Sequence, residues 1–291
     1  MSFWTKPNQD YERPCIITCA LSGVVADRAQ CPAIPYTPEE YAVEAKRAYE
    51  AGASVVHIHA RSPDGAPSYE VQDYGNIYGA VTAACPILIN FSTGAIGIST
   101  ERKTAPITAI KPAVGALNMG SMNYAKYHPK KKDFVFEFVF QNPFSEIISI
   151  LKIMNEAGTK PEMECFDVGH IGNSYPLIDM GLLRAPYQYS LILGVIGGIP
   201  PLVSNLMQMV EQLPTPSVWE VIGIGNDQWR LVAAAIALGG NVRVGLEDNF
   251  YVSPTAMAKS NGELVEKAAR MVRDQGREVA TIEETRRLLE L

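Results

Sequence analysis

Short, unbroken apolar segments alternate with longer segments of helical periodicity along nearly the whole chain. Most of the apolar segments show no regular polar/apolar alternation, so they are typical of parallel strands covered on both faces. The eight predicted strands are Cys15–Leu21, Ser54–His59, Pro86–Phe91, Gly115–Met119, Glu162–Phe166, Tyr189–Gly194, Val218–Gly223 and Val242–Glu247.

Several intervening segments carry helix start and stop signals. Thr37-Pro38-Glu39-Glu40 provides a Thr N-cap, a Pro at the first helical position and a capping Glu for a helix that runs to Ala51. Gly52 then supplies the left-handed residue that ends a helix. Further helices are predicted from Asn142-Pro143 to Gly158, over Ile199–Leu213, Asp227–Leu238 and Asn261–Gln275, and from Thr281 onward.

Eight strands with helices between them predict one α/β domain over residues 1–291, a (β/α)8 or TIM barrel with residues 1–13 as an N-terminal extension. The aromatic and β-branched run Phe134–Phe140 predicts a short strand inserted after barrel strand four, and the last helix forms a C-terminal extension. Asn173–Ala185 is too rich in Pro and Gly to assign. The alternative is a doubly wound open sheet, but Leu21–Ala26 lacks the Gly-rich phosphate loop expected there.

Composition limits the possible partners and the compartment. The 291 residues contain 25 Lys and Arg against 31 Asp and Glu, a net charge of −6, and the only basic cluster is Lys130–Lys132. Nucleic acid is therefore not an expected partner. No apolar run reaches the ~18 residues of a membrane span, and the first ten residues lack an apolar signal core. Five scattered cysteines without a CxxC pair predict no disulfide framework, so we expect a cytoplasmic protein.

The second predicted strand ends in a pair of histidines, His57 and His59. Residues i and i+2 of a strand point to the same side, and the catalytic residues of such barrels stand at the carboxyl ends of the strands. Two imidazoles converging there predict a metal site with open positions for water or substrate. The alternative is that both rings lie on a buried face and bond to neighbouring groups.

The last predicted strand supplies candidates for a third ligand. Its end, Arg243-Val244-Gly245-Leu246-Glu247-Asp248-Asn249, is the densest polar cluster at any strand end. One carboxylate with two imidazoles makes a catalytic zinc site with one open position. Glu247 and Asp248 are adjacent and would face opposite ways on a strand, so one of them is the expected ligand. Arg243 and Asp248 could instead form a structural ion pair at the rim.

Other strand ends are polar as well. Ser92 and Thr93 precede Gly94, an arrangement that binds an anion such as a substrate carboxylate, although it is also ordinary turn chemistry. Asn118 ends the fourth strand. No role is predicted for Glu162, Glu164, His128 or His170.

These motifs together resemble the β-keto acid cleavage enzyme family over about residues 14–291. The resemblance rests mainly on His57-Ile58-His59-Ala60-Arg61 and Gly245-Leu246-Glu247-Asp248-Asn249, supported by Ser92-Thr93-Gly94 and Leu117-Asn118-Met119-Gly120. It implies a zinc-containing barrel that converts a β-keto acid and acetyl-CoA to acetoacetate and a new acyl-CoA by Claisen and retro-Claisen chemistry. It also implies a homotetramer.

The resemblance further implies a role for each matching residue. His57, His59 and Glu247 match the zinc ligands, one ion per chain. Asp248 matches the general base and Arg243 its supporting cation, while Ser92 and its neighbour Thr93 match the substrate-binding hydroxyl segment.

Three positions depart from the members of the family that act on an amino-substituted substrate. Those members carry Glu, Gly and Thr where this chain has Val25, Ala95 and Ala116, positions expected with Asn118 to line the substrate pocket. An ammonium group against a valine loses hydration without a counter-charge. We therefore expect a β-keto acid with an uncharged tail. A tail carboxylate would need an arginine in the pocket, for which the candidates are Arg28, Arg61 and Arg102.

Two alternatives belong to other classes. A metal-dependent hydrolase of the amidohydrolase type also places His-x-His on a barrel strand, but on the first one, and it needs further histidines and a late Asp. The second alternative is a catalytically inactive, ligand-binding barrel.

Overall fold

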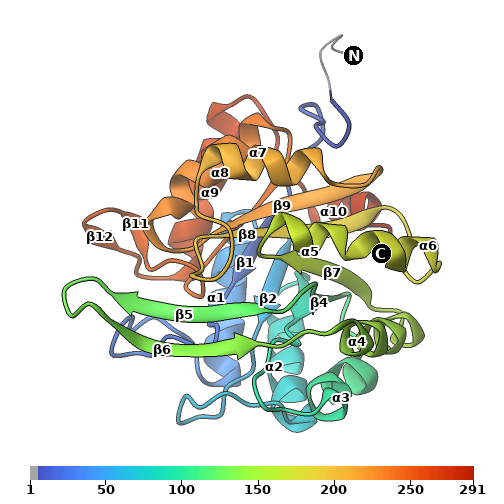
Figure 1. The fold of residues 1–291 in the computed structure, drawn as a ribbon. Coiled ribbons are helices and arrows are strands. Elements are labelled where there is room, and N and C mark those ends of the chain that lie inside the picture. The colour runs from blue at the N-terminus through green and yellow to red at the C-terminus, as the bar shows by residue number, and fades with distance from the viewer. Residues whose placement is uncertain (1–5) are drawn as a thin grey trace.

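The apolar segments form a closed barrel of parallel strands in the computed structural model, which describes residues 6–291 (Figure 1). Around the barrel the order is β1, β10, β9, β8, β7, β4, β3, β2. Their bounds are β1 Ile17–Ala20, β2 Val55–Ile58, β3 Leu88–Phe91, β4 Val114–Asn118, β7 Lys160–Cys165, β8 Tyr187–Leu193, β9 Ser217–Gly223 and β10 Asn241–Val244. The TIM-barrel prediction is confirmed, and the open-sheet alternative is wrong because β1 pairs with both β2 and β10.

Helices surround the barrel where the capping signals placed them. Thr37 accepts a hydrogen bond from the backbone of Glu40 in a complete capping box, and Gly52 ends α1 at a φ of 116°. The helices are α1 Pro38–Ala51, α2 Val71–Ala84, α3 Thr100–Ile110, α4 Phe144–Ala157, α5 Val168–Gly172, α6 Ser174–Asp179, α7 Val203–Glu211, α8 Gln228–Ala237, α9 Asn261–Asp274 and α10 Ile282–Leu289, with a 3-10 turn η1 at Gly225–Asp227. The unassigned segment Asn173–Ala185 contains α6.

The insertion after β4 is a two-stranded antiparallel hairpin rather than a single strand. Its strands are β5 Met122–His128 and β6 Asp133–Phe140, joined by a turn that contains Lys130–Lys132. The sequence did not indicate β5 because its apolar and polar residues follow no clear alternation. A further small hairpin, β11 Tyr251–Ser253 and β12 Ala256–Met257, follows β10.

The hairpin β5–β6 packs one aromatic face on the barrel. Tyr124 stacks on Phe138 at a ring-centroid distance of 5.1 Å and meets Phe166, which follows β7, edge to face. Phe140 and Phe166 join a buried apolar cluster with Ile192 and Ile222 from the ends of β8 and β9. This packing places an aromatic wall beside the carboxyl ends of the barrel strands.

The opposite end of the barrel is closed by the C-terminal helix. Leu289 of α10 packs with Ile16, Val55, Leu88 and Val218 in a second buried cluster. The five cysteines are free and buried, as expected for core residues. Of the predicted extension 1–13, residues 1–5 lie outside the described residues. Among the helices within 6–291, none combines the length and the apolar character needed to cross a bilayer.

Candidate active site

A cavity of about 790 Å³ opens at the carboxyl ends of the barrel strands, beside the hairpin β5–β6. One part of its wall is polar, and the remainder is largely apolar. The polar part contains His59, Ser92, Asn118, Glu164, Arg243, Glu247 and Asp248. The aromatic residues of the apolar part include Tyr69, Tyr124, Phe136, Phe138, Phe140, Phe166 and Phe250.

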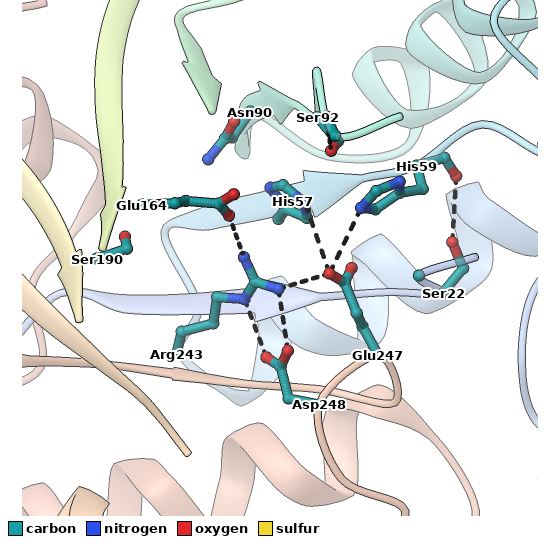
Figure 2. A network of polar contacts seen from close by, with 12 residues as sticks. Ser22, His57, His59, Asn90, Ser92, Glu164, Ser190, Arg243, Glu247 and Asp248 are labelled. Atoms are coloured by element: carbon teal, nitrogen blue, oxygen red, sulfur yellow. Dashed lines mark hydrogen bonds and ion pairs between the residues drawn. The ribbon is translucent and has the colours of Figure 1, made fainter. Parts of the chain in front are cut away.

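Two histidines and one glutamate converge in the polar part. His57 is in β2, and His59 follows that strand by one residue, so both rings point the same way (Figure 2). Glu247 Oε1 lies 3.8 Å from His57 Nε2 and 3.5 Å from His59 Nε2. One ligand atom from each residue lies within 4.8 Å of the other two. The arrangement of the predicted metal-ligand residues is thus compact.

Barrel closure explains how residues so distant in sequence meet. Strand β1 lies between β2 and β10, so Glu247 must reach the histidines across the end of β1. The residue at that point is Gly23, in the left-handed region at φ 56°, where a Cβ atom would lie 2.7 Å from Glu247 Cγ. Glycine therefore leaves the space that the Glu247 side chain occupies.

A turn after β10 decides how Glu247 and Asp248 point. The predicted strand Val242–Glu247 stops at Val244, because Gly245 adopts a φ of 138° and its carbonyl accepts hydrogen bonds from the backbone of Asp248 and Asn249. The two carboxylates are therefore not held on opposite faces of a strand. Both line the cavity, Glu247 beside the histidines and Asp248 beside Arg243.

The protonation states of the cluster suit a divalent cation. Burial and the Arg243 charge hold the pKa of His57 well below its usual value, so the ring is neutral. Burial alone would raise the pKa of Glu247, but the neighbouring Arg243 charge holds it well below its usual value. Glu247 Oε2 is buried without a hydrogen-bond partner. A neutral imidazole at His57, an ionised carboxylate and an unpaired oxygen fit a zinc-type ligand set.

Arg243 is buried among three carboxyl groups (Figure 2). It donates two hydrogen bonds to Asp248, at 2.9 and 3.0 Å, one to Glu247 at 2.7 Å and one to Glu164 at 3.3 Å. Burial raises the pKa of Asp248 to about 6, against the lowering effect of the Arg243 charge. The Arg243–Asp248 ion pair exists, and it lines the cavity together with Glu247.

The other predicted substrate-binding residues divide into two groups. Ser92, Asn118, Val25 and Ala95 line the cavity, and the Ser92 Oγ atom accepts a hydrogen bond from Gly94 N. Thr93 and Ala116 do not line the cavity. The Thr93 hydroxyl donates to the Ala116 carbonyl at 2.6 Å, which joins the end of β3 to β4.

Residues without a predicted role are also placed. Glu164 joins the site through Arg243, and burial raises its pKa to about 7. Glu162 is buried inside the barrel, where it accepts hydrogen bonds from Asn90, Gln188 and Ser190. His128 ends β5, next to the hairpin turn, and His170 Nδ1 accepts a hydrogen bond from the backbone of Phe166.

The aromatic wall and the buried Asn90 were not assigned to the site from the sequence. A signal existed for the aromatic wall, since Phe134, Phe136, Phe138 and Phe140 recur every second residue of the predicted inserted strand. Of these, Phe136, Phe138 and Phe140 line the cavity. No comparable pattern surrounds Asn90.

Comparisons with known proteins show which proteins this chain resembles. The chain is 37% identical over 278 residues to 3-keto-5-aminohexanoate cleavage enzyme of Fusobacterium nucleatum, covering 95% of this chain and 97% of that protein. It is 31% identical over 299 residues to 3,5-dioxohexanoate:acetyl-CoA acetone transferase of Paraburkholderia graminis, covering 96% of each. The solved structure of ObcA with oxaloacetate shares the fold, with a TM-score of 0.76 at 21% identity over 89% of this chain and 68% of that one.

A comparison with protein-family models identifies the family. The model described as beta-keto acid cleavage enzyme matches residues 14–291, the same span as the resemblance found in the sequence motifs. The chain therefore belongs to the β-keto acid cleavage enzyme family.

Proposed function

We propose that this enzyme uses a zinc ion, one per chain, to convert a β-keto acid and acetyl-CoA to acetoacetate and a new acyl-CoA. The observation that carries the proposal is the convergence of His57, His59 and Glu247 beside the Arg243–Asp248 pair. His57 is buried behind the cavity wall, and His59, Glu247, Arg243 and Asp248 line the cavity. The family assignment supports the reaction class, and the name of the Paraburkholderia relative supports acetyl-CoA as co-substrate.

The residues divide the chemistry between them. A zinc ion held by His57, His59 and Glu247 would act as a Lewis acid toward the ketone and carboxylate oxygens of the substrate. Asp248 accepts the proton from C2 of the β-keto acid, and Arg243 keeps that carboxylate ionised before the transfer. Ser92 and Asn118, which line the same cavity, would bind the substrate carboxylate.

The bonds balance without an oxidant or reductant. C2 of the deprotonated β-keto acid forms a bond to the acetyl carbon of acetyl-CoA, and CoA leaves that carbon. The CoA sulfur then forms a bond to C3 of the original substrate as the C2–C3 bond breaks, and C2 takes back the proton that Asp248 accepted. The products are acetoacetate, which contains C1 and C2 of the substrate, and an acyl-CoA that contains the tail.

We propose that the tail carries no amino group. Val25 lines the cavity and is 58% exposed. The three arginines that could meet a tail carboxylate do not line the cavity: Arg28 pairs with Glu40, Arg102 pairs with Glu70, and Arg61 is bonded to backbone carbonyls. Within residues 6–291 the acids that line it, Glu164, Glu247 and Asp248, all contact Arg243 in the polar part.

The amidohydrolase alternative lacks support. Among the residues that the structure describes, His57, His59 and Glu247 form the only cluster able to hold a metal ion, and neither His128 nor His170 belongs to it. The family model that matches the chain is that of the β-keto acid cleavage enzymes and not of the amidohydrolases. A homotetramer stays a prediction from the resemblance, which light scattering of the purified protein would measure.

Product analysis tests the proposal directly. The purified protein, with its metal content measured, is incubated with acetyl-CoA and a panel of β-keto acids, and the thioesters are identified by mass spectrometry. We expect acetoacetate and an acyl-CoA with the substrate tail, lost on removal of zinc by a chelator and restored by its return. A metal-free protein with full activity, or hydrolysis of acetyl-CoA without a new thioester, would contradict the proposal.

A further inference from the structure

A layer of buried polar side chains lies inside the barrel and takes no part in the proposed chemistry. Its members are Thr18, Asn90, Glu162, Gln188, Ser190 and Glu220, contributed by β1, β3, β7, β8 and β9. Buried polar groups are costly unless they are hydrogen-bonded, so a connected network at this place needs an explanation.

Asn90 is the member of this network that lies next to the metal-ligand residues. It is the register partner of His57 across the β2–β3 pair, and Figure 2 shows its side chain beside the His57 ring. His57 Nδ1 and Asn90 Oδ1 are both buried, and neither has a hydrogen-bond partner. One atom is a nitrogen that can carry a proton, and the other is an oxygen that can only accept one.

The rest of the network fixes which way the Asn90 amide points. Asn90 Nδ2 donates to Glu162 Oε2 at 2.5 Å, and Gln188 Nε2 donates to the same oxygen at 3.2 Å. The Asn90 nitrogen is directed at Glu162, and its oxygen is the atom left without a partner, free to accept a hydrogen bond from His57. Asn90 is thus an acceptor, rather than a donor, toward the imidazole.

Ser190 contacts the other oxygen of the Glu162 carboxyl group, so that Oε2 remains free to accept the hydrogen bond from Asn90. Its Oγ atom lies 2.8 Å from Glu162 Oε1 and 3.1 Å from Glu220 Oε1. One hydroxyl proton can bond only one of these oxygens at a time, so a proton retained by one of the two carboxyls would satisfy the other contact. Burial raises the pKa of Glu162 to about 8 and that of Glu220 to about 7, in agreement with a retained proton. If the retained proton is on Glu162, it is carried by Oε1, the oxygen next to Ser190. Glu162 Oε2 then still accepts the hydrogen bond from Asn90.

We propose that Asn90 is a positioning residue that accepts the Nδ1–H of His57 and so fixes its tautomer, leaving the Nε2 lone pair free for the metal ion proposed to bind His57, His59 and Glu247. The inference rests on the proposed zinc site, because its purpose is to present His57 Nε2 to a metal ion. Outer partners of this kind orient metal-binding histidines, and their loss typically weakens metal affinity roughly 10- to 100-fold.

The tautomer can be observed without metal or substrate. Full-length protein labelled with ¹⁵N-histidine is freed of metal with a chelator, and long-range ¹H–¹⁵N spectra at neutral pH report which nitrogen of each ring carries the proton. The chain has four histidines, so a His57→Gln sample assigns the signal. We expect the Nδ1–H tautomer at His57. The Nε2–H tautomer in the wild type would overturn the inference, whether or not any variant folds.

A matched pair of variants distinguishes two possible roles of Asn90: positioning of the His57 ring, and hydrogen bonding to Glu162. Asn90→Leu and Gln188→Leu each remove one amide that donates to Glu162, but only Asn90 adjoins His57. We expect Asn90→Leu to lose the Nδ1–H preference and to raise the zinc Kd roughly 10- to 100-fold in a chelator competition, with Gln188→Leu close to wild type. Equal effects of both variants would overturn the inference. If the wild type binds no zinc, the proposed function fails, while the tautomer still decides the role of Asn90.

Discussion

Arg243 and Asp248 face each other through two nearly equal hydrogen bonds, Nε to Oδ2 at 2.9 Å and Nη2 to Oδ1 at 3.0 Å. This bidentate contact fixes the plane of the carboxylate and still leaves lone pairs on both oxygens for a substrate proton. The same Nη2 atom also donates to Glu247. The proposed base and the proposed metal ligand therefore share one buried cation, and changes to either carboxylate are expected to have different consequences.

Asp248→Asn is expected to lower turnover by roughly 10²- to 10⁴-fold, the usual contribution of a general base, because an amide cannot accept the C2 proton. Zinc should remain bound, since Asp248 is not one of the three clustered ligands. Steady-state kinetics and metal analysis of the same preparation measure both effects. Loss of zinc with retained turnover of reloaded protein would assign the ligand role to Asp248 instead.

Glu247→Gln is expected to have the reverse pattern, with weakened zinc retention as the primary defect. The change removes the negative charge from the cluster while keeping the shape of the side chain. Dialysis against graded chelator concentrations, with Asp248→Asn as the control, compares the zinc Kd of each variant with that of the wild type. A Glu247→Gln protein that holds zinc as tightly as the wild type would contradict the assignment.

Gly23→Ala is expected to disturb the metal site through sterics alone. The new Cβ atom would lie 2.7 Å from Glu247 Cγ, at a φ of 56°. Gly97→Ala is a matched control, because Gly97 has a φ of 69° and a methyl group added there would meet no atom within 4 Å. Both changes add left-handed strain of about 1–2 kcal/mol, measured by denaturant unfolding. Only Gly23→Ala should weaken zinc binding.

Val25→Glu is expected to shift substrate preference toward an amino-substituted β-keto acid. The wild type should favour a tail without an amino group, because an ammonium group at Val25 would lose hydration without a counter-charge. The measurement is kcat/KM for amino, aliphatic and dicarboxylic β-keto acids. Val43→Glu on α1 adds the same charge at an exposed site that does not line the cavity, and should change nothing. A wild type that prefers the amino compound would refute the argument.

Folding stability is expected to fall as pH rises from about 4.5 to about 8. The pKa of Glu162 is raised by burial from 4.5 to about 8, so in this window the folded protein binds a proton that the unfolded chain has released. This contribution is fully present below pH 4.5 and lost as pH passes 8, with a slope of up to about 1.4 kcal/mol per pH unit for one proton. Glu162→Gln mimics the protonated side chain and should flatten the dependence measured by urea unfolding. An unchanged slope would mean that Glu162 is ionised throughout.

The barrel, its order of strands and helices, and the His57–His59 pair follow from the sequence because each depends on local periodicity. Unbroken apolar runs indicated buried parallel strands, and Thr37 and Gly52 marked the ends of α1 through capping that involves only nearby residues. The direction shared by His57 and His59 follows from the two-residue period of a strand. The hairpin partner β5 was missed because its apolar and polar residues show no such period.

Residue spacing left open which carboxylate meets the histidines; the family resemblance implied Glu247, and only the tertiary structure shows the contact and what surrounds it. Glu247 and Asp248 were indistinguishable by spacing, and the turn at Gly245, with the gap left by Gly23 across β1, gave them separate surroundings. The contacts of Arg243 with Glu164, and of Asn90 with Glu162, join strands that are distant in sequence. Such contacts depend on how the barrel closes and on which inward-pointing side chains lie at the same level along the barrel axis. A local sequence pattern encodes neither of these.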